Sequence, residues 1–190
     1  DTGKMTRKEL SEKLGYVGQE TACVFDFTVE DIIGMALYNR KKEKTSSKEI
    51  IRHAMEELKI TDFSGRNIQT LSGGERKMVF LARAVAQGVD TIILDEPTNH
   101  LDICHQLFLL NYLKQSGKTI LIVIHDLRLA SYYCDTLYLM EEGRVLSHGT
   151  PQKVLTRDHV EKVFGISGYM VEREDGEADF AIDFEKRIEN

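Results

Sequence analysis

The chain has 190 residues, of which 42% are apolar and 29% charged, and its formal net charge is −6. This length suffices for one domain with a hydrophobic core, and the composition is that of an ordinary globular protein. The mild acidic balance, without a basic stripe, argues against nucleic acid as a partner. A membrane helix needs about 20 consecutive apolar residues. The longest apolar runs have five residues, as at residues 120–124, so no membrane span is expected.

The cysteines indicate the redox compartment of the protein, and the first residues indicate whether the sequence starts within a longer chain. Cys23, Cys104 and Cys134 show no metal-ligand spacing, which favours reduced thiols in a cytosolic protein. Residues 1–4 include neither an initiator Met nor the beginning of an apolar signal peptide. We therefore expect the sequence to start within a longer protein.

The first half of the chain predicts one short strand and two helices, at residues 14–17, 29–38 and 46–59. Thr28 can cap the first of these helices, and Ser46 with Glu49 forms the capping-box pattern for the second. A polar loop at residues 41–47 separates the two helices. Together they predict a helical insert over about residues 21–67.

The second half predicts helices and strands in alternation. Strands are expected at 91–94 and 119–124, helices at 72–86, 103–115 and 127–134, and a hairpin at 136–140 and 144–147. Because the first two strands are almost continuously apolar, we expect them to be buried on both faces of a parallel sheet. The fold class is therefore α/β, with helices flanking a parallel sheet. From residue 168 onward the sequence is charged and weakly patterned, and no role is assigned to it.

The string Leu-Ser-Gly-Gly-Glu at residues 71–75 predicts more than a helix start. Ser72 and Glu75 form another capping box, which by itself does not require two glycines. Gly73 and Gly74 let backbone N–H groups approach an anion closely at the positive end of the helix dipole. This arrangement favours a phosphate site.

Two carboxylates follow a buried strand, at Asp95 and Glu96, and Pro97 comes next. Ligand chemistry in parallel sheets gathers at the carboxyl ends of strands. Asp95 suits Mg²⁺, which prefers oxygen ligands, and Glu96 can orient or deprotonate a water. We expect Pro97 to hold Glu96 in an extended conformation. An acidic turn without any chemistry is the alternative for this pair taken alone.

Two polar residues after strands complete the set, Gln19 behind residues 14–17 and His125 behind residues 119–124. Each has a plain structural explanation when taken alone. In order, however, Gln19, residues 71–75, residues 92–102 and His125 resemble the Q-loop, signature motif, Walker B strand with D-loop, and switch histidine of ABC ATPases. The resemblance covers about residues 14–165.

The resemblance implies roles on both sides of a head-to-tail dimer. Ser72, Gly73 and Gly74 would contact the γ-phosphate of ATP bound to the opposite subunit, and Asp102 would communicate across the dimer. In this chain Arg76-Lys77-Met78 stands where the family usually has a Gln-Arg pair.

Within one subunit the same resemblance assigns the catalytic groups. Asp95 would hold Mg²⁺ through water, Glu96 would be the general base, and His125 would contact the γ-phosphate. Gln19 would sense the metal and link the site to the membrane partner. The implied division is a helical subdomain at 21–86, an α/β core at 1–20 and 87–165, and a C-terminal tail at 166–190.

Residues 95–103, 125–127, 143–145 and 149–151 are similar to the importers of ferric siderophores, haem or cobalamin. This implies an ATPase that works with Mg²⁺ at the cytoplasmic face of a membrane. Its partners would be a second ATPase subunit, permease subunits and, indirectly, a substrate-binding protein. The ATPase does not touch the cargo, so no residue here selects it.

One family element is not found, the phosphate-binding loop G-x-x-x-x-G-K-[ST]. Gly117-Lys118-Thr119 does not qualify, because Tyr112 occupies the first glycine position and a strand follows. The family places this loop some tens of residues before Gln19. We therefore expect an N-terminally truncated domain that is inactive by itself.

Three functional hypotheses follow. The first is the ATP-hydrolysing subunit of an importer. The second is a non-catalytic module that donates Ser72, Gly73 and Gly74 to a partner, although such a donor would not need Asp95 and Glu96. The third is an ABC ATPase of DNA repair, which would normally contain a long coiled coil, and no heptad run occurs here. An ABC transporter of another substrate class also remains open.

Overall fold

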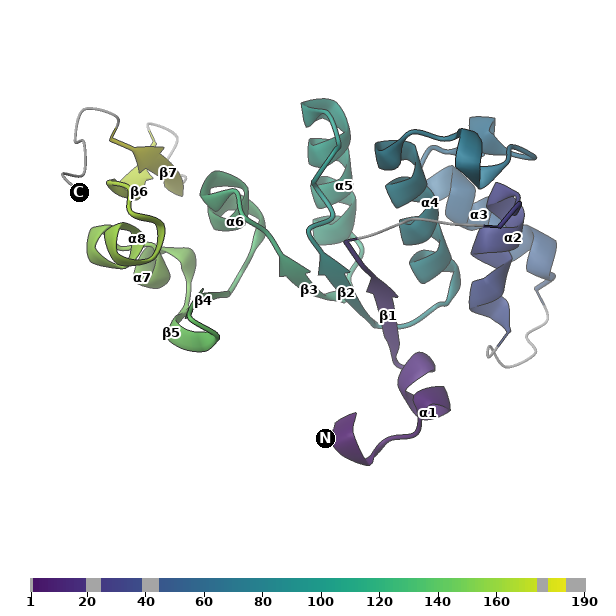
Figure 1. Ribbon diagram of the computed structural model, residues 1–190, viewed down its shortest axis with the longest axis horizontal. Helices are drawn as coiled ribbons and strands as arrows, with labels where there is room; N and C mark the ends of the chain where they lie inside the picture. The colour runs from purple at the N-terminus through teal and green to yellow at the C-terminus, as the bar shows by residue number, and fades with distance from the viewer. Residues whose placement is uncertain (1, 20–24, 39–44, 174–177, 184–190) are drawn as a thin grey trace. The chain divides into compact units, whose positions relative to one another are not determined.

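The computed structural model describes residues 2–19, 25–38, 45–173 and 178–183. Cys23 and part of the loop expected at 41–47 lie outside these ranges. The chain forms two compact units, Asp1–Val123 and Ile124–Asn190 (Figure 1). Among the described residues, no helix combines the length and apolar content needed to cross a membrane.

The first unit contains a parallel sheet, as predicted. Its strands are β1 (Leu14–Val17), β2 (Thr91–Asp95) and β3 (Thr119–Val123), hydrogen-bonded in the order β1-β2-β3. Gly15 pairs with Ile92, which in turn pairs with Ile120. The carboxyl ends of all three strands therefore meet at one edge of the sheet.

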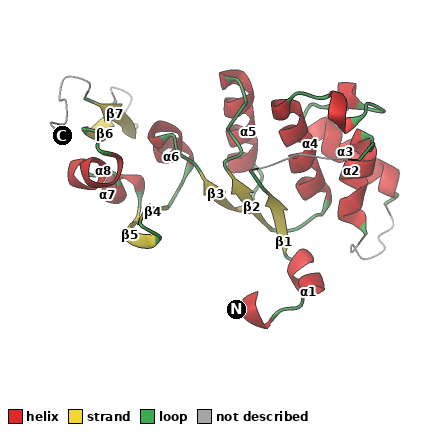
Figure 2. Cartoon of the chain, viewed as in Figure 1, coloured by secondary structure: helices red, strands yellow, loops and turns green. Residues whose placement is uncertain are grey.

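One face of this sheet builds the core together with two long helices, α4 (Gly73–Ala86) and α5 (Ile103–Gln115) (Figure 2). The buried side chains include Val17, Ile92 and Leu94 from the strands, with Val79 from α4 and Leu109 from α5. Each fully buried side chain of this size contributes about 1.5–3 kcal/mol relative to exposure. This packing holds the starts of α4 and α5 close to the ends of the strands.

The two helices predicted for the helical insert over residues 21–67 are present in the described residues. The insert contains α2 (Val29–Gly34), the 3₁₀ turn η2 (Met35–Leu37) and α3 (Ser47–Glu57), and both α2 and α3 pack on α4. Thr28 caps α2 as expected, in a capping box with Asp31, and Ser46 forms the expected capping box with Glu49. Short elements complete the unit: η1 (Thr2–Lys4), α1 (Arg7–Ser11), η3 (Thr61–Phe63) and η4 (Ile68–Thr70).

The expectation that β3 is buried on both faces is wrong. Ile120 and Ile122 pack against the core, but Leu121 is 55% and Val123 47% exposed on the opposite face. Tyr16 of β1 is likewise 56% exposed. A continuous apolar run permits burial of both faces of a strand. Which faces are buried depends on where helices pack, and here the core lies on only one face of β3.

The second unit begins with α6 (Leu127–Tyr133) and the predicted hairpin of β4 (Leu137–Glu141) and β5 (Arg144–Gly149). Two residues make the turn, Glu142 at φ 48° and Gly143 at φ 75°. Positive φ at both turn positions suits the right-handed twist of the flanking strands. Two helices follow, α7 (Pro151–Val154) and α8 (Arg157–Phe164).

The segment without an assigned role from residue 168 onward forms a second antiparallel hairpin. Its strands are β6 (Gly168–Glu172) and β7 (Ala178–Ile182), and Tyr169 pairs with Ala181. Phe180 is 1% exposed and belongs to the core of this unit together with Leu139, Val154 and Val160. The strands were missed because a charged stretch interrupts two apolar segments that are each only a few residues long.

Candidate functional site

Two segments of the first unit meet at the carboxyl edge of the parallel sheet. Gln19 follows β1, Asp95 ends β2, and Glu96 follows it directly. Because β1 and β2 are parallel neighbours, the sheet brings together residues that are 77 positions apart in the chain. The structure thus places Gln19 in contact with Glu96, and the predicted metal-sensing role of Gln19 stays a prediction.

The Glu96 carboxylate is held by two amide side chains. Gln19 Nε2 donates to Glu96 Oε2 over 2.8 Å, and Asn99 Nδ2 donates to the same oxygen over 2.5 Å. The two donors restrict the orientation of this carboxylate. Asn99 lies within the 92–102 motif, and its position three residues after Glu96 is the sequence signal for this contact.

The backbone at Glu96 is not extended, so the expectation based on Pro97 is wrong. Its φ is 47°, in the left-handed region that residues other than glycine seldom adopt. Such a conformation costs about 1–3 kcal/mol and persists only where surrounding contacts impose it. The Glu96 N–H donates to the Val123 carbonyl over 3.2 Å, and the Glu96 carbonyl accepts from the Asn99 N–H over 3.3 Å.

A buried lysine contacts the same residue. Lys77 Nζ, from α4, donates to the Glu96 carbonyl oxygen over 2.6 Å, and the side chain is only 3% exposed. Burial lowers the pKa of Lys77, while the negative charges of Glu96 and Asp95 oppose that shift. No local pattern predicts this contact, because Lys77 lies 19 residues before Glu96.

The donor set fits Mg²⁺ held jointly with a phosphate ligand. The described residues contain no group of three or more His, Cys, Asp or Glu side chains that could hold a metal by themselves. Mg²⁺ in nucleotide sites usually keeps several waters and takes one or two carboxylates together with substrate phosphates. Asp95 at the end of β2, with the Gln19 amide near Glu96, provides a partial set of this kind.

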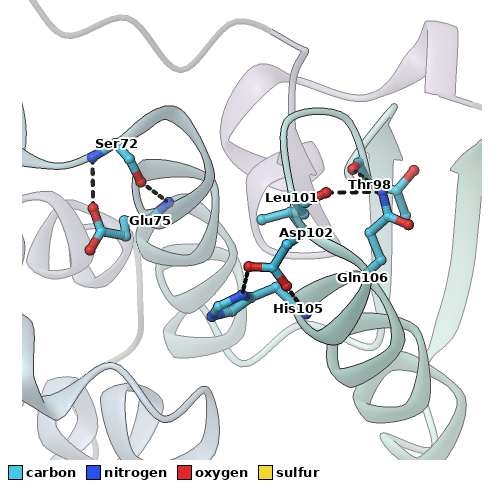
Figure 3. Close-up of polar contacts among 7 residues, drawn as sticks. All are labelled: Ser72, Glu75, Thr98, Leu101, Asp102, His105 and Gln106. Atoms are coloured by element: carbon cyan, nitrogen blue, oxygen red, sulfur yellow. Dashed lines mark hydrogen bonds and ion pairs between the residues drawn. The ribbon is translucent and has the colours of Figure 1, made fainter.

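The 71–75 string starts α4 as predicted. Ser72 Oγ accepts from the Glu75 N–H over 3.3 Å, and the Glu75 carboxylate accepts from the Ser72 N–H over 2.7 Å (Figure 3). The backbone and hydroxyl hydrogen bonds from Ser72 hold the pKa of Glu75 below its usual value. Capping of α4 is therefore sufficient to explain Ser72, and phosphate binding would be a second function of the same residue.

The two glycines of this string have different surroundings. A Cβ added at Gly73 would meet nothing within 4 Å. At Gly74 it would lie 2.9 Å from Leu101 Cδ2 and 3.1 Å from the His100 carbonyl oxygen. Gly74 thus permits the close approach of the segment between β2 and α5, whereas no such contact explains Gly73.

That segment ends in a second capped helix. Asp102 Oδ1 accepts from the His105 N–H over 2.9 Å, and Asp102 Oδ2 lies 2.7 Å from His105 Nδ1 (Figure 3). These contacts, led by the backbone hydrogen bond, lower the pKa of the Asp102 carboxyl. Gln106 Nε2 donates to the carbonyls of Thr98 and Leu101, each over 3.1 Å.

Ser72 and Asp102 line one cavity of about 320 Å³, together with Gly74, Glu75 and His105. A larger cavity of about 840 Å³ lies elsewhere in the first unit, between residues of α2 and α3 such as Gly34 and Met55. Only the smaller of these two cavities is lined by the predicted phosphate-binding residues at the start of α4. The structure therefore brings the predicted residues together in two sets: Gln19, Asp95 and Glu96 in one, and Ser72, Gly74 and Asp102 in the other.

His125 belongs to the second unit, where it precedes Asp126. Asp126 caps α6 by accepting from the N–H groups of Arg128 and Leu129. The contact of His125 with a γ-phosphate stays a prediction.

A family model described as ABC transporter matches residues 1–99. The chain is 33% identical over 176 residues to the iron(3+)-hydroxamate import ATP-binding protein FhuC of Bacillus subtilis, covering 88% of this chain and 65% of that protein. It is 32% identical over 179 residues to the hemin import ATP-binding protein HmuV of Bordetella parapertussis, covering 87% and 68%. The chain thus spans about two thirds of the length of these relatives.

A solved structure agrees on the fold. A putative metal-chelate type ABC transporter in an inward-facing conformation matches with a TM-score of 0.78, 23% identity, and coverage of 90% of this chain and 72% of that one. A parallel sheet with capped helices at its carboxyl edge, the ordered motifs and these similarities lead to one conclusion. The chain belongs to the ABC transporter family.

Proposed function

We propose that this chain is part of an ATP-hydrolysing subunit that powers an ABC importer. The observation that carries the proposal is the Glu96 carboxylate, which Gln19 and Asn99 hold at the carboxyl edge of the sheet, next to Asp95. A carboxylate fixed in this way can accept the proton of a water that attacks the γ-phosphate. Asp95 would hold Mg²⁺ through water, and the bound ion would neutralise phosphate charge.

The other set of residues would serve a second copy of the subunit. Ser72, Gly73 and Gly74 present a helix N-terminus, which attracts phosphate, and the exposed Gly73 has no structural need to be glycine. We propose that these residues complete the ATP site of the opposite subunit, with Asp102 and His125 in the roles that the family resemblance implies. A permease and a substrate-binding protein would be the further partners, at the cytoplasmic face of a membrane.

The proposed cargo is a ferric siderophore, haem or cobalamin. Relatives at 30–36% identity are named for iron(3+)-hydroxamate, ferric enterobactin, hemin and cobalamin import. Because several cargoes appear at similar identity, the comparison supports the group and not one member of it.

The test replaces Glu96 by Gln in a longer polypeptide that carries this sequence behind a phosphate-binding loop. Glu96→Gln preserves the shape of the side chain but cannot accept a proton, so turnover should fall by about 10²-fold or more while ATP binding persists. Phosphate release and nucleotide binding are the two measurements. Asp62→Asn, at an exposed residue of η3, is the matched control and should leave turnover unchanged. Wild-type turnover in Glu96→Gln would remove Glu96 from the role of base.

A non-catalytic donor of the Ser72 motif is the second candidate. The hydrogen bond between Gln19 and Glu96 argues against this candidate. A module that only donates the start of α4 would not require an oriented general base. This candidate predicts that Glu96→Gln leaves the turnover of a mixed complex unchanged while Ser72 variants abolish it.

The 190-residue chain alone should bind ATP weakly. The phosphate-binding loop supplies much of the grip on the β- and γ-phosphates, and its motif does not occur among the 190 residues. Calorimetric titration with millimolar ATP should show little heat, and a micromolar dissociation constant would contradict this expectation.

A further inference from the structure

Lys77 is the only charged side chain that the described part of the chain buries almost completely, at 3% exposure. It lies on α4 beside Met78 and Val79, which are also buried. Lysine is seldom buried unless a partner compensates for lost hydration. None of the roles proposed above uses Lys77, so its burial needs an explanation of its own.

The partner of Lys77 is a backbone atom of the proposed base. Lys77 Nζ donates to the Glu96 carbonyl oxygen over 2.6 Å. The next residue is Pro97, which is buried and has no N–H. The hydrogen bond from Lys77 thus orients the peptide group between Glu96 and Pro97, where the chain leaves β2.

This peptide group needs such support because Glu96 has φ 47°. The same carbonyl oxygen accepts a longer bond of 3.3 Å from the Asn99 N–H. A charged donor makes a shorter and stronger hydrogen bond than a neutral amide. The carboxylates of Glu96 and Asp95 also attract the ammonium group, which helps to explain how a lysine is tolerated at a buried position.

We propose that Lys77 is a positioning residue for Glu96. Its ammonium group holds the Glu96 carbonyl oxygen, and the left-handed backbone that results aims the Glu96 carboxylate at Gln19 and Asn99. In this view the start of α4 serves two sites. Its first residues face a phosphate, and Lys77, one turn further on, fixes the acid at the end of β2.

The chain contains a matched control. Lys118 Nζ also donates to a backbone carbonyl, that of Val89, over 2.5 Å. Val89 and Lys118 precede β2 and β3, at the edge of the sheet opposite to Asp95. Lys118→Met therefore removes the same kind of contact without touching Glu96.

The first experiment measures amide hydrogen exchange in the 190-residue chain, and it does not depend on ATP. Lys77→Met should speed exchange at the Glu96 and Asn99 N–H groups by about tenfold beyond any change in global stability. Lys77→Gln retains an N–H donor and should retain most of the protection. Lys118→Met should leave both amides unchanged. If Lys77→Met does not fold, Lys77→Leu offers a second apolar variant for the same comparison.

The second experiment rests on the proposed function and uses the longer polypeptide with a phosphate-binding loop. Lys77→Met should lower kcat by about tenfold with KM for ATP within about threefold, because the base is misplaced while the phosphates are still held. Lys77→Gln should recover most of that loss. A merely structural lysine would show no rescue by Gln and no effect confined to kcat.

The two readouts separate two kinds of failure. If Glu96 and Asn99 exchange at unchanged rates in both Lys77→Met and Lys77→Gln, the positioning role is overturned whatever the activity shows. If the unsubstituted longer polypeptide does not hydrolyse ATP while the exchange effect is present, the proposed function fails and the contact between Lys77 and Glu96 stands.

Discussion

Gly73 and Gly74 are neighbours in the sequence, yet only one of them is required by packing. The Cβ of an alanine at position 74 would come within 3.1 Å of the His100 carbonyl oxygen, a backbone atom that cannot rotate away. The same Cβ at position 73 would point into open space. Packing therefore explains the glycine at position 74, and a ligand is the remaining explanation for the glycine at position 73.

Gly74→Ala should destabilise the chain by about 1–3 kcal/mol, the usual cost of overpacking. Gly73→Ala should be neutral or stabilise it by up to about 1 kcal/mol, because alanine favours the helix. Urea unfolding of the 190-residue chain measures both. A Gly73→Ala variant that is stable but inactive in the longer polypeptide would indicate a phosphate role at this position. Equal destabilisation by both variants would contradict this account.

At the scale of elements, one polar contact joins the end of α3 to α5. The Tyr112 hydroxyl donates to Glu57 Oε2 over 2.5 Å, in a half-buried position. Burial raises the pKa of the Tyr112 hydroxyl well above its ordinary value, and the hydrogen bond and charge of Glu57 add to the shift. The neutral hydroxyl is the form that the folded state favours.

This shift makes the contact sensitive to alkaline pH. The contribution of Tyr112 to stability is fully present below the unfolded pKa of about 10 and is lost as the pH rises above it, because the unfolded chain then ionises more readily. Tyr112→Phe should cost about 1 kcal/mol at pH 7 and less at pH 11. Urea unfolding at the two pH values measures the difference. Tyr138→Phe, at an exposed tyrosine of β4, is the control. If Tyr112→Phe cost more free energy of unfolding at pH 11 than at pH 7, the raised pKa of Tyr112 would be contradicted.

At the scale of the whole molecule, the first unit exposes apolar side chains on strands at both edges of its sheet. Tyr16 lies on β1, and Leu121 and Val123 lie on β3, all of them about half exposed. Edge strands that carry exposed apolar groups promote association through strand addition or face-to-face packing. This is the structural basis for expecting the chain to self-associate.

We expect the 190-residue chain to form dimers or larger species that neither ATP nor EDTA alters. Val123→Lys should shift sedimentation toward the monomer, because a charge on this face opposes burial. Val145→Lys, at an exposed valine of β5 in the second unit, is the matched control and should leave the distribution unchanged. A stable monomer of the unsubstituted chain at high concentration would contradict the expectation.

Local features and the family can be predicted from the sequence alone. The caps at Thr28, Ser46 and Ser72 each join residues three positions apart, so the pattern contains both partners. The helix predicted at 103–115 occurs with the same bounds. The order of the motifs indicated the ABC transporter family, which the comparison with known proteins shows.

Contacts between residues far apart in the chain depend on the tertiary structure. Gln19 and Glu96 are 77 residues apart, and the register of parallel strands brings them into contact. The contact between Lys77 and Glu96 and the positive φ of Glu96 arise where α4 packs on the end of β2, and no local pattern contains either. The half-exposed β3 and the hairpin formed by β6 and β7 have the same origin. Burial and strand pairing of a short apolar segment depend on which other elements pack against it, and those elements come from distant parts of the chain.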